Sequence, residues 1–192
     1  MKNVVIIIVL FQSFQFIYAQ KGFIETKKYL VTTEITDQGK EHPAYVVNLV
    51  RSGNSSEKIS TLTIDDTELF EDIFITTLEN PGLEGISEVI KMEVEYLGCC
   101  AHVEAYYFTV SDDGDTIVSL PELKNVYCEN SNTDFQYIFP NQEYGIQGNI
   151  LQTQTFYKNT SDIKYVNLKK SFEWTNGAIT IDPSNTIAIT SN

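Results

Sequence analysis

Apolar and polar residues alternate along much of the chain, which is the pattern of β-strands rather than of helices. The clearest case is residues 89–97, where apolar side chains fill every second position: Ile90, Met92, Val94 and Tyr96. The positions between them are charged: Lys91, Glu93 and Glu95. A period of two places these two sets on opposite faces of an extended chain. Residues 89–97 are therefore predicted to form a strand with one buried and one solvated face.

Further runs rich in β-branched and aromatic residues recur, and turn residues separate them. They cover residues 29–36, 44–50, 58–64, 101–110, 116–120, 135–139, 146–157, 163–174, 178–181 and 186–190. The strongest hairpin signal is Ser111-Asp112-Asp113-Gly114-Asp115, where a turn explains the acidic residues without a calcium ion. About ten short strands predict an all-β fold, a single-domain β-sandwich or barrel-like structure over residues 20–192.

Residues 66–78 give two conflicting signals. Asp65 and Glu68 have capping-box spacing, and the apolar residues after them fit one short helix. Ile73-Phe74-Ile75-Thr76-Thr77, in contrast, has strong strand propensity. The sequence leaves both a short helix and a strand open here.

Residues 1–19 have the three parts of a secretory signal peptide. A short basic start with Lys2 leads into an apolar stretch, and the small residue Ala19 precedes Gln20. No later segment is long and apolar enough to span a membrane as a helix. We therefore expect export, with a secreted or periplasmic location and no membrane span after signal cleavage.

The balance of charge narrows the choice of partners. The chain has 26 acidic and 13 basic residues, a net charge of −13. Nucleic acids and anionic membrane surfaces both attract basic proteins, so this balance argues against either partner. At 42% apolar and 12% aromatic residues, the chain is too apolar for a disordered acidic tail.

Three cysteines, Cys99, Cys100 and Cys128, carry the most specific chemical information. In an oxidising compartment thiols tend to pair, so we expect one structural disulfide and one spare thiol. Either Cys99 or Cys100 could bond to Cys128, and a vicinal Cys99–Cys100 bond is a third alternative. A different hypothesis is a zinc or copper site made by Cys99, Cys100, His102 and Cys128, although adjacent cysteines on a strand point apart.

Aromatic residues offer candidate ligand contacts. Tyr106, Tyr107 and Tyr144 lie in aromatic-rich segments, and exposed tyrosine rings can hold a sugar ring. The alternative is that these side chains cover the sheet and pair across strands.

Catalytic motifs are scarce. The chain has two histidines, His42 and His102, and no nucleophile-elbow, zinc-protease or phosphate-loop motif. The sequence therefore favours a non-enzymatic binding module without a cofactor, which recognises a carbohydrate or a cell-surface protein. The alternatives are a hydrolase that uses a pair of carboxylates and the metal-binding protein described above.

Overall fold

The computed structural model describes residues 22–36, 39–65, 67–128, 131–158, 163–175, 177–181 and 188–189. The predicted signal peptide, residues 1–19, lies outside these ranges. Within them, no helix is long and apolar enough to cross a membrane.

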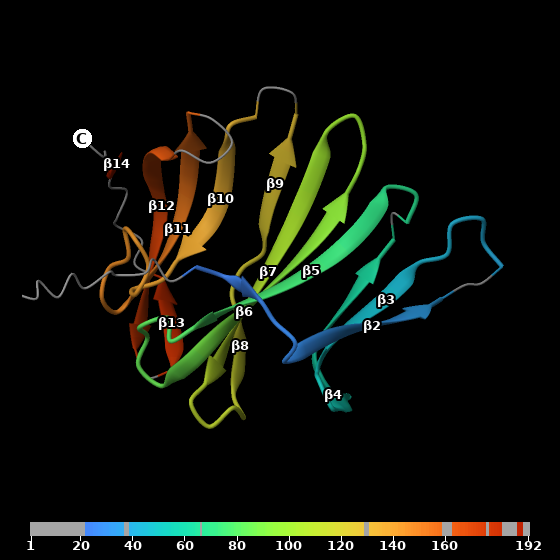
Figure 1. The fold of residues 1–192 in the computed structure, drawn as a ribbon, viewed down its shortest axis with the longest axis horizontal. Coiled ribbons are helices and arrows are strands. Elements are labelled where there is room, and N and C mark those ends of the chain that lie inside the picture. The colour runs from blue at the N-terminus through green and yellow to red at the C-terminus, as the bar shows by residue number, and fades with distance from the viewer. Residues whose placement is uncertain are drawn as a thin grey trace, which may run out of the picture.

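The described residues form fourteen strands in three antiparallel sheets (Figure 1). The six-stranded sheet has the order β1-β5-β6-β7-β8, with β9 also paired to β7. Its strands are β1 (Ile24–Glu25), β5 (Phe70–Glu79), β6 (Ile86–Tyr96), β7 (Ala101–Ser111), β8 (Ile117–Ser119) and β9 (Leu123–Tyr127).

The other two sheets lie on either side of it. The five-stranded sheet contains β10 (Thr133–Ile138), β11 (Asn149–Tyr157), β12 (Ile163–Thr175), β13 (Ala178–Ile181) and β14 (Ala188–Ile189). The three-stranded sheet contains β2 (Tyr29–Ile35), β3 (Tyr45–Arg51) and β4 (Asn54–Ile64). This arrangement confirms the predicted all-β, sandwich or barrel-like class, and β9 and β10 continue a curl that resembles half of a barrel (Figure 1).

In the ambiguous segment, residues 70–78 belong to a strand, and the described residues 67–69 before it form a turn. The short helix considered from the sequence is therefore not present in the described residues 67–78. Strand β5 pairs antiparallel with β6 from Phe70 to Glu79. Ile73 and Ile75 pack on one face, against the core shared with the three-stranded sheet, while Phe74 between them is exposed. This period of two satisfies strand pairing, and tertiary packing therefore decides against the helical spacing.

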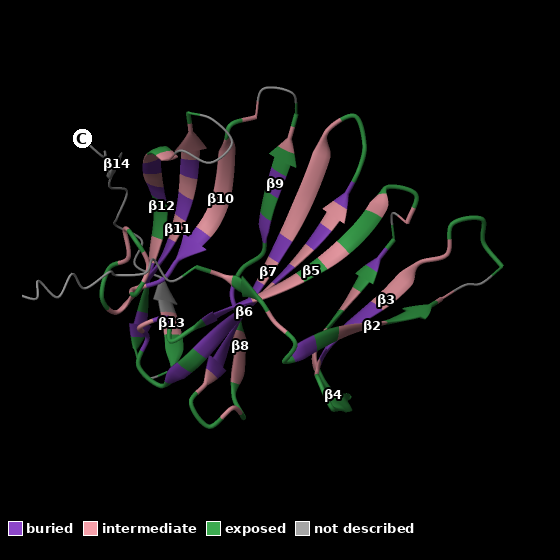
Figure 2. Ribbon diagram, in the orientation of Figure 1, coloured by how far each residue is buried: buried purple, intermediate pink, exposed green. Residues whose placement is uncertain are grey.

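Strand β6 is central because both of its faces are covered (Figure 2). Val89 packs toward the five-stranded sheet, in a core that includes Tyr107, Phe139 and Trp174. The apolar face predicted from the sequence (Ile90, Met92, Val94 and Tyr96) packs instead with residues of the three-stranded sheet. The opposite, charged face is half-buried rather than fully solvated.

A side chain joins the six-stranded sheet to the five-stranded sheet. The Asn125 amide lies on β9, and its Nδ2 donates to the carbonyl oxygen of Phe135 at 3.0 Å. The amide nitrogen of Phe135 on β10 donates to Asn125 Oδ1 at 2.6 Å. The side chain thus makes the pair of hydrogen bonds that a neighbouring strand would make. We call this contact the Asn125 bridge.

The three-stranded sheet is attached through charged groups at its rim. The Tyr29 hydroxyl donates to Glu88 Oε1 at 2.6 Å, and Lys28 Nζ lies 3.1 Å from Glu88 Oε2. Arg51 donates through its guanidinium to the carbonyl oxygen of Gly114. Gly114 lies in the turn between β7 and β8 and has a φ of 80°. The turn predicted at residues 111–115 is thereby confirmed, and it serves as a docking point for the sheet.

Candidate functional site

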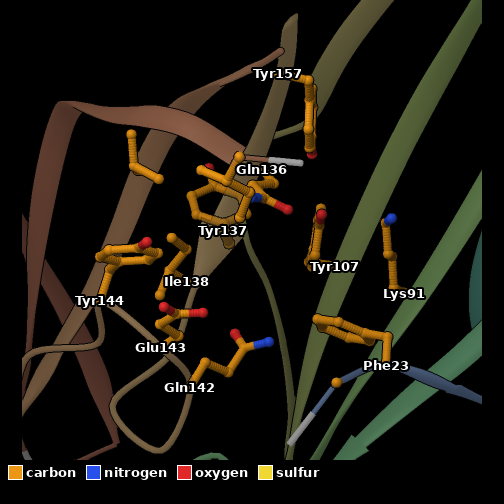
Figure 3. Close-up of a pocket in the computed structure, with 13 residues that line it drawn as sticks. Phe23, Lys91, Tyr107, Gln136, Tyr137, Ile138, Gln142, Glu143, Tyr144 and Tyr157 are labelled. Atoms are coloured by element: carbon orange, nitrogen blue, oxygen red, sulfur yellow. The ribbon is translucent and has the colours of Figure 1, made fainter. Parts of the chain in front are cut away.

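A cavity of about 310 Å³ opens between β7 and β10 (Figure 3). Five aromatic side chains line it: Phe23, Tyr107, Tyr137, Tyr144 and Tyr157. Its polar lining is provided by Lys91, Gln136, Gln142 and Glu143. This mixture of rings and a few polar groups is typical of small-molecule sites in proteins. We call it the β7–β10 cavity.

The cavity exists because β10 is joined to the six-stranded sheet only locally. The Asn125 bridge holds β10 at Phe135. Further along β10, the rings of Tyr107 and Tyr137 meet edge to face with centroids 5.0 Å apart. Figure 3 shows Tyr107 on the β7 side and Tyr137 on the β10 side of the space. Two large rings thus replace the ladder hydrogen bonds and keep the strands apart.

The lysine of the cavity is already engaged with protein groups. Lys91 Nζ lies 2.6 Å from Glu93 Oε1. The same nitrogen is 5.9 Å from the ring centroids of both Phe23 and Tyr107. The carboxylate compensates the positive charge, and the rings add a cation–π contact. Lys91 consequently offers hydrogen bonds to a ligand more readily than it offers net charge.

The phenols of the cavity remain protonated at neutral pH. Burial raises the pKa of Tyr137 to about 12. Burial, together with the hydrogen-bonded carboxylate of Asp134, also raises the pKa of Tyr157 to about 12. For Tyr144 the pKa is raised by burial and by the carboxylate of Glu143.

Tyr107 and Tyr137 are almost fully buried and form the floor of the cavity. The rings that a ligand can reach are therefore those of Phe23, Tyr144 and Tyr157, which are half-buried. The hydroxyl groups of Tyr144 and Tyr157 are neutral.

Tyr144 is held in an unusual backbone conformation. Its φ is 65°, in the left-handed region that bulky residues rarely adopt. The loop that holds it is tight, because Gln142 Oε1 accepts a hydrogen bond from the amide of Phe139 at 3.0 Å. A Cβ at Gly145 would lie 2.2 Å from the carbonyl oxygen of Phe139, so that position requires glycine. The fold accepts backbone strain of about 1 kcal/mol in order to place the Tyr144 ring beside the cavity.

Two of the three tyrosines that the sequence singled out meet at this cavity. Tyr107 and Tyr144 line it, whereas Tyr106 faces the opposite side of β7 and donates its hydroxyl to Glu104 Oε2 at 2.9 Å. Phe23, Lys91 and the two glutamines belong to no pattern in the sequence that marks a ligand site. Phe156-Tyr157 was a visible aromatic pair that could have drawn attention to Tyr157.

The cysteines form one disulfide, between Cys100 and Cys128. The ladder of β7 and β9 pairs Ala101 with Tyr127, so Cys100 and Cys128 occupy the next rung. Cys99 is exposed and carries a free thiol. Of the alternatives left open by the sequence, the structure has the Cys100–Cys128 bond.

This bond also bears on the hypothetical metal site. Two of its four ligands, Cys100 and Cys128, are joined to each other. The imidazole of His102 instead stacks on Tyr96, with centroids 4.4 Å apart. In the part of the chain that the structure describes, no three histidine, cysteine or acidic side chains gather as metal ligands.

A hydrolytic pair of carboxylates would need two acidic groups that face the same ligand. Among the described residues lining the β7–β10 cavity, Glu143 is the one carboxylate. The nearby Glu93 is bound to Lys91. The carboxylate of Asp134 lies behind the lining, where it is hydrogen-bonded to Tyr157.

Comparisons of the chain with protein-family models, with curated proteins and with solved structures found no match.

Proposed function

We propose that the protein is an exported, non-enzymatic binding module and that its β7–β10 cavity holds a carbohydrate. The observation that carries the proposal is the lining of five aromatic rings with amide and hydroxyl groups beside them. Sugar rings have apolar C–H faces, which suit aromatic side chains, and equatorial hydroxyls, which suit planar amides and phenols. Neutral phenols and a compensated lysine favour an uncharged saccharide over an ionic ligand.

The backbone of Tyr144 supports the same proposal. Residues held in sparsely populated conformations cluster at ligand sites, where the surrounding structure maintains them. Asparagine or glycine at this position would adopt the left-handed backbone conformation with less strain than tyrosine does. A tyrosine at this position, beside an aromatic cavity, is expected where its ring contributes to binding.

Export is a second part of the proposal. It rests on the predicted signal peptide, and the Cys100–Cys128 disulfide is typical of proteins that fold in oxidising compartments. Carbohydrates of cell surfaces and secretions are present in the same compartments. A free thiol at Cys99 needs no role in this function.

The test is a glycan array followed by calorimetric titration of the best saccharide. Tyr144→Ala and Tyr157→Ala should each weaken binding by about tenfold or more, because each removes a ring from the cavity. Tyr165→Ala is the matched control: Tyr165 stacks on Phe156 in the same sheet and is not part of the cavity lining. Binding should change little with salt, since the interaction is largely uncharged.

The proposal fails if no glycan binds, or if Tyr165→Ala weakens binding as much as Tyr144→Ala does. Release of shortened saccharide during the titration would instead support the hydrolase alternative. Thermal unfolding of each variant separates loss of binding from loss of fold.

A further inference from the structure

A second recess lies away from the β7–β10 cavity, between the edge of the six-stranded sheet and the three-stranded sheet. It measures about 520 Å³ and is lined by Leu30 and Val31 of β2, by residues 73–76 of β5 and by Glu25. Figure 1 shows β2 and β3 beside the half of the molecule that contains β5. We call this recess the β2–β5 groove.

The backbone of β5 is open along this groove. On one side β5 pairs with β6 over its whole length. On the other side β1 pairs only with Thr76 and Thr77, in the described part of the chain. The amide nitrogen of Ile73 donates to the side chain of Asp72 at 2.7 Å, so this amide points away from β6. Because amide directions alternate, the amide of Ile75 points to the same open edge.

Most exposed strand edges are shortened, charged or covered, since an open edge invites another strand. Here β1 covers two residues, and none of the described residues pairs with the continuation of its path beside residues 73–75. In addition, Thr76 Oγ1 is buried and has no hydrogen-bond partner among the described residues. The Ile73 amide is already satisfied by Asp72, so the hydrogen-bonding groups that the groove offers are the amide of Ile75 and the side chain of Thr76.

Large apolar side chains surround the same edge. Ile24 is 60% exposed, and Leu30 and Phe74 are each 49% exposed. They come from three different strands, β1, β2 and β5. Exposed apolar groups that gather beside an open strand mark an interaction site rather than scattered surface residues.

Charge specifies the chemistry of the occupant. Glu25 lines the groove, and Glu71 and Asp72 are exposed on β5. Glu93 also lines it and is compensated by Lys91. None of the described residues lining the groove is basic. An acidic chain with a net charge of −13 would repel a second copy of itself at such a site.

We propose that the β2–β5 groove binds an extended peptide segment of another protein, in which basic and apolar residues alternate. The segment adds to the free edge of β5 as an antiparallel strand in line with β1. Its main chain takes the open amide and carbonyl groups, which is the usual mode of strand addition. Glu25 is paired with Thr76, so it shares one face of the sheet with Asp72 and Phe74. The basic side chains of the segment lie on this face, with their aliphatic stems over Phe74. Its apolar side chains lie on the opposite face, with Ile73 and Ile75, beside Leu30 of β2.

The test uses a synthetic peptide of alternating lysine and valine, added to the full mature chain. Calorimetry should show binding that weakens as salt rises, and hydrogen exchange should slow at residues 70–76. A glutamate–valine peptide should bind about tenfold or more weakly. A lysine–valine peptide with one central valine replaced by proline should also bind weakly, because it lacks one main-chain donor.

Variants of the protein locate the site. Leu30→Ala and Phe74→Ala should each weaken peptide binding severalfold. Ile35→Ala is the matched control, since Ile35 is 52% exposed at the far end of β2 and does not line the groove. Tyr144→Ala should leave peptide binding unchanged, so this proposal and the carbohydrate proposal can fail independently.

Three results would overturn the proposal. One is equal binding of the lysine and glutamate peptides, and another is equal weakening by Ile35→Ala and Leu30→Ala. The third is slowed exchange at residues 70–76 on raising the concentration of the protein alone, which would assign the edge to a second copy of this chain.

Discussion

The six-stranded sheet is held on its two faces by different chemistry. Toward the five-stranded sheet, neutral side chains bond to backbone groups: the Asn125 bridge, Tyr137 to Pro121 at 3.1 Å, and Trp174 to Glu84 at 3.0 Å. Toward the three-stranded sheet, the rim contacts involve ions, as with Arg51 and Glu88. Aromatic residues are a minority of the buried side chains in both cores, and the first core contains the tryptophan, Trp174.

This difference has energetic consequences. A buried neutral group bonded to backbone is insensitive to salt, and its loss leaves backbone groups unpaired at a cost of about 1–3 kcal/mol. Exposed ion pairs contribute about 0–1 kcal/mol each, and salt screens them. We therefore expect the Asn125 bridge to contribute more to stability than the partly exposed Arg51 contact. The hydrogen bond from Tyr29 to Glu88 is the exception at the rim, because both of its side chains are buried.

The largest effect should come from the disulfide that fixes β9. The double variant Cys100→Ser/Cys128→Ser releases a loop of 28 residues, and the free energy of unfolding should fall by about 3–4 kcal/mol. Urea unfolding of the purified variant measures it. Cys99→Ser serves as the control and should change stability by less than about 0.5 kcal/mol, because Cys99 is exposed and unbonded. An unchanged free energy of unfolding in the double variant would mean that the disulfide does not stabilise β9 in the fold.

The next effect compares the two attachments directly. Asn125→Ala leaves both the amide and the carbonyl of Phe135 without their partner, and should lower the free energy of unfolding by about 2 kcal/mol. Arg51→Ala should lower it by about 1 kcal/mol or less, since the side chain is partly exposed. Denaturant titrations in low and high salt measure both. Equal losses, or a larger loss for Arg51→Ala, would contradict the comparison.

The smallest effect concerns alkaline pH. The pKa of Tyr137 is about 12 in the folded protein because of burial, against about 10 in an unfolded chain. The folded state therefore holds this proton more tightly, and stability is complete below about pH 10 and declines as pH rises toward 12. Tyr137→Phe should remove about 1 kcal/mol of the decline between about pH 8 and about pH 11.

Unfolding free energies at these two pH values provide the measurement. Tyr137→Phe loses the hydrogen bond to Pro121 at both pH values. The wild type and the variant therefore differ in the change of unfolding free energy between the two pH values only through the ionisation of the Tyr137 phenol. An identical decline in the wild type and in Tyr137→Phe would show that this phenol does not resist ionisation.

The spacing of apolar residues was sufficient to predict most strands. It was insufficient where the same residues fit both the helical period and the strand period. The alternation at residues 89–97 predicted which side chains of β6 are apolar and share a face. At residues 66–78 the apolar residues fit helix and strand alike, and only pairing with β6 and packing of Ile73 and Ile75 decide between them. Such long-range contacts leave no local mark in the sequence.

The candidate site illustrates a different difficulty. Tyr107 and Tyr144 could be selected as aromatic residues, but their meeting depends on β10 lying beside β7, which is a non-local contact. The sequence does not show which of Tyr106 and Tyr107 lines the cavity, because this depends on which face of β7 is directed toward β10. Asn125 gave no signal, because an asparagine that replaces a strand's hydrogen bonds resembles any asparagine in a turn.

The register of β7 and β9 has a consequence for oxidative maturation. Cys99 and Cys100 lie just before β7, and Cys128 lies just after β9. A Cys99–Cys128 bond that keeps the two cysteines directly opposite each other shifts β9 by one residue, and such a shift exchanges the two faces of a strand. Leu123 and Asn125 would turn outward, while Lys124 and Val126 would turn into the core. The docked sheet therefore favours the Cys100–Cys128 isomer. Each isomer keeps one free cysteine, Cys99 in the native chain and Cys100 in the mispaired one, so thiol exchange can convert the mispaired bond into the native bond once β9 docks in its native register.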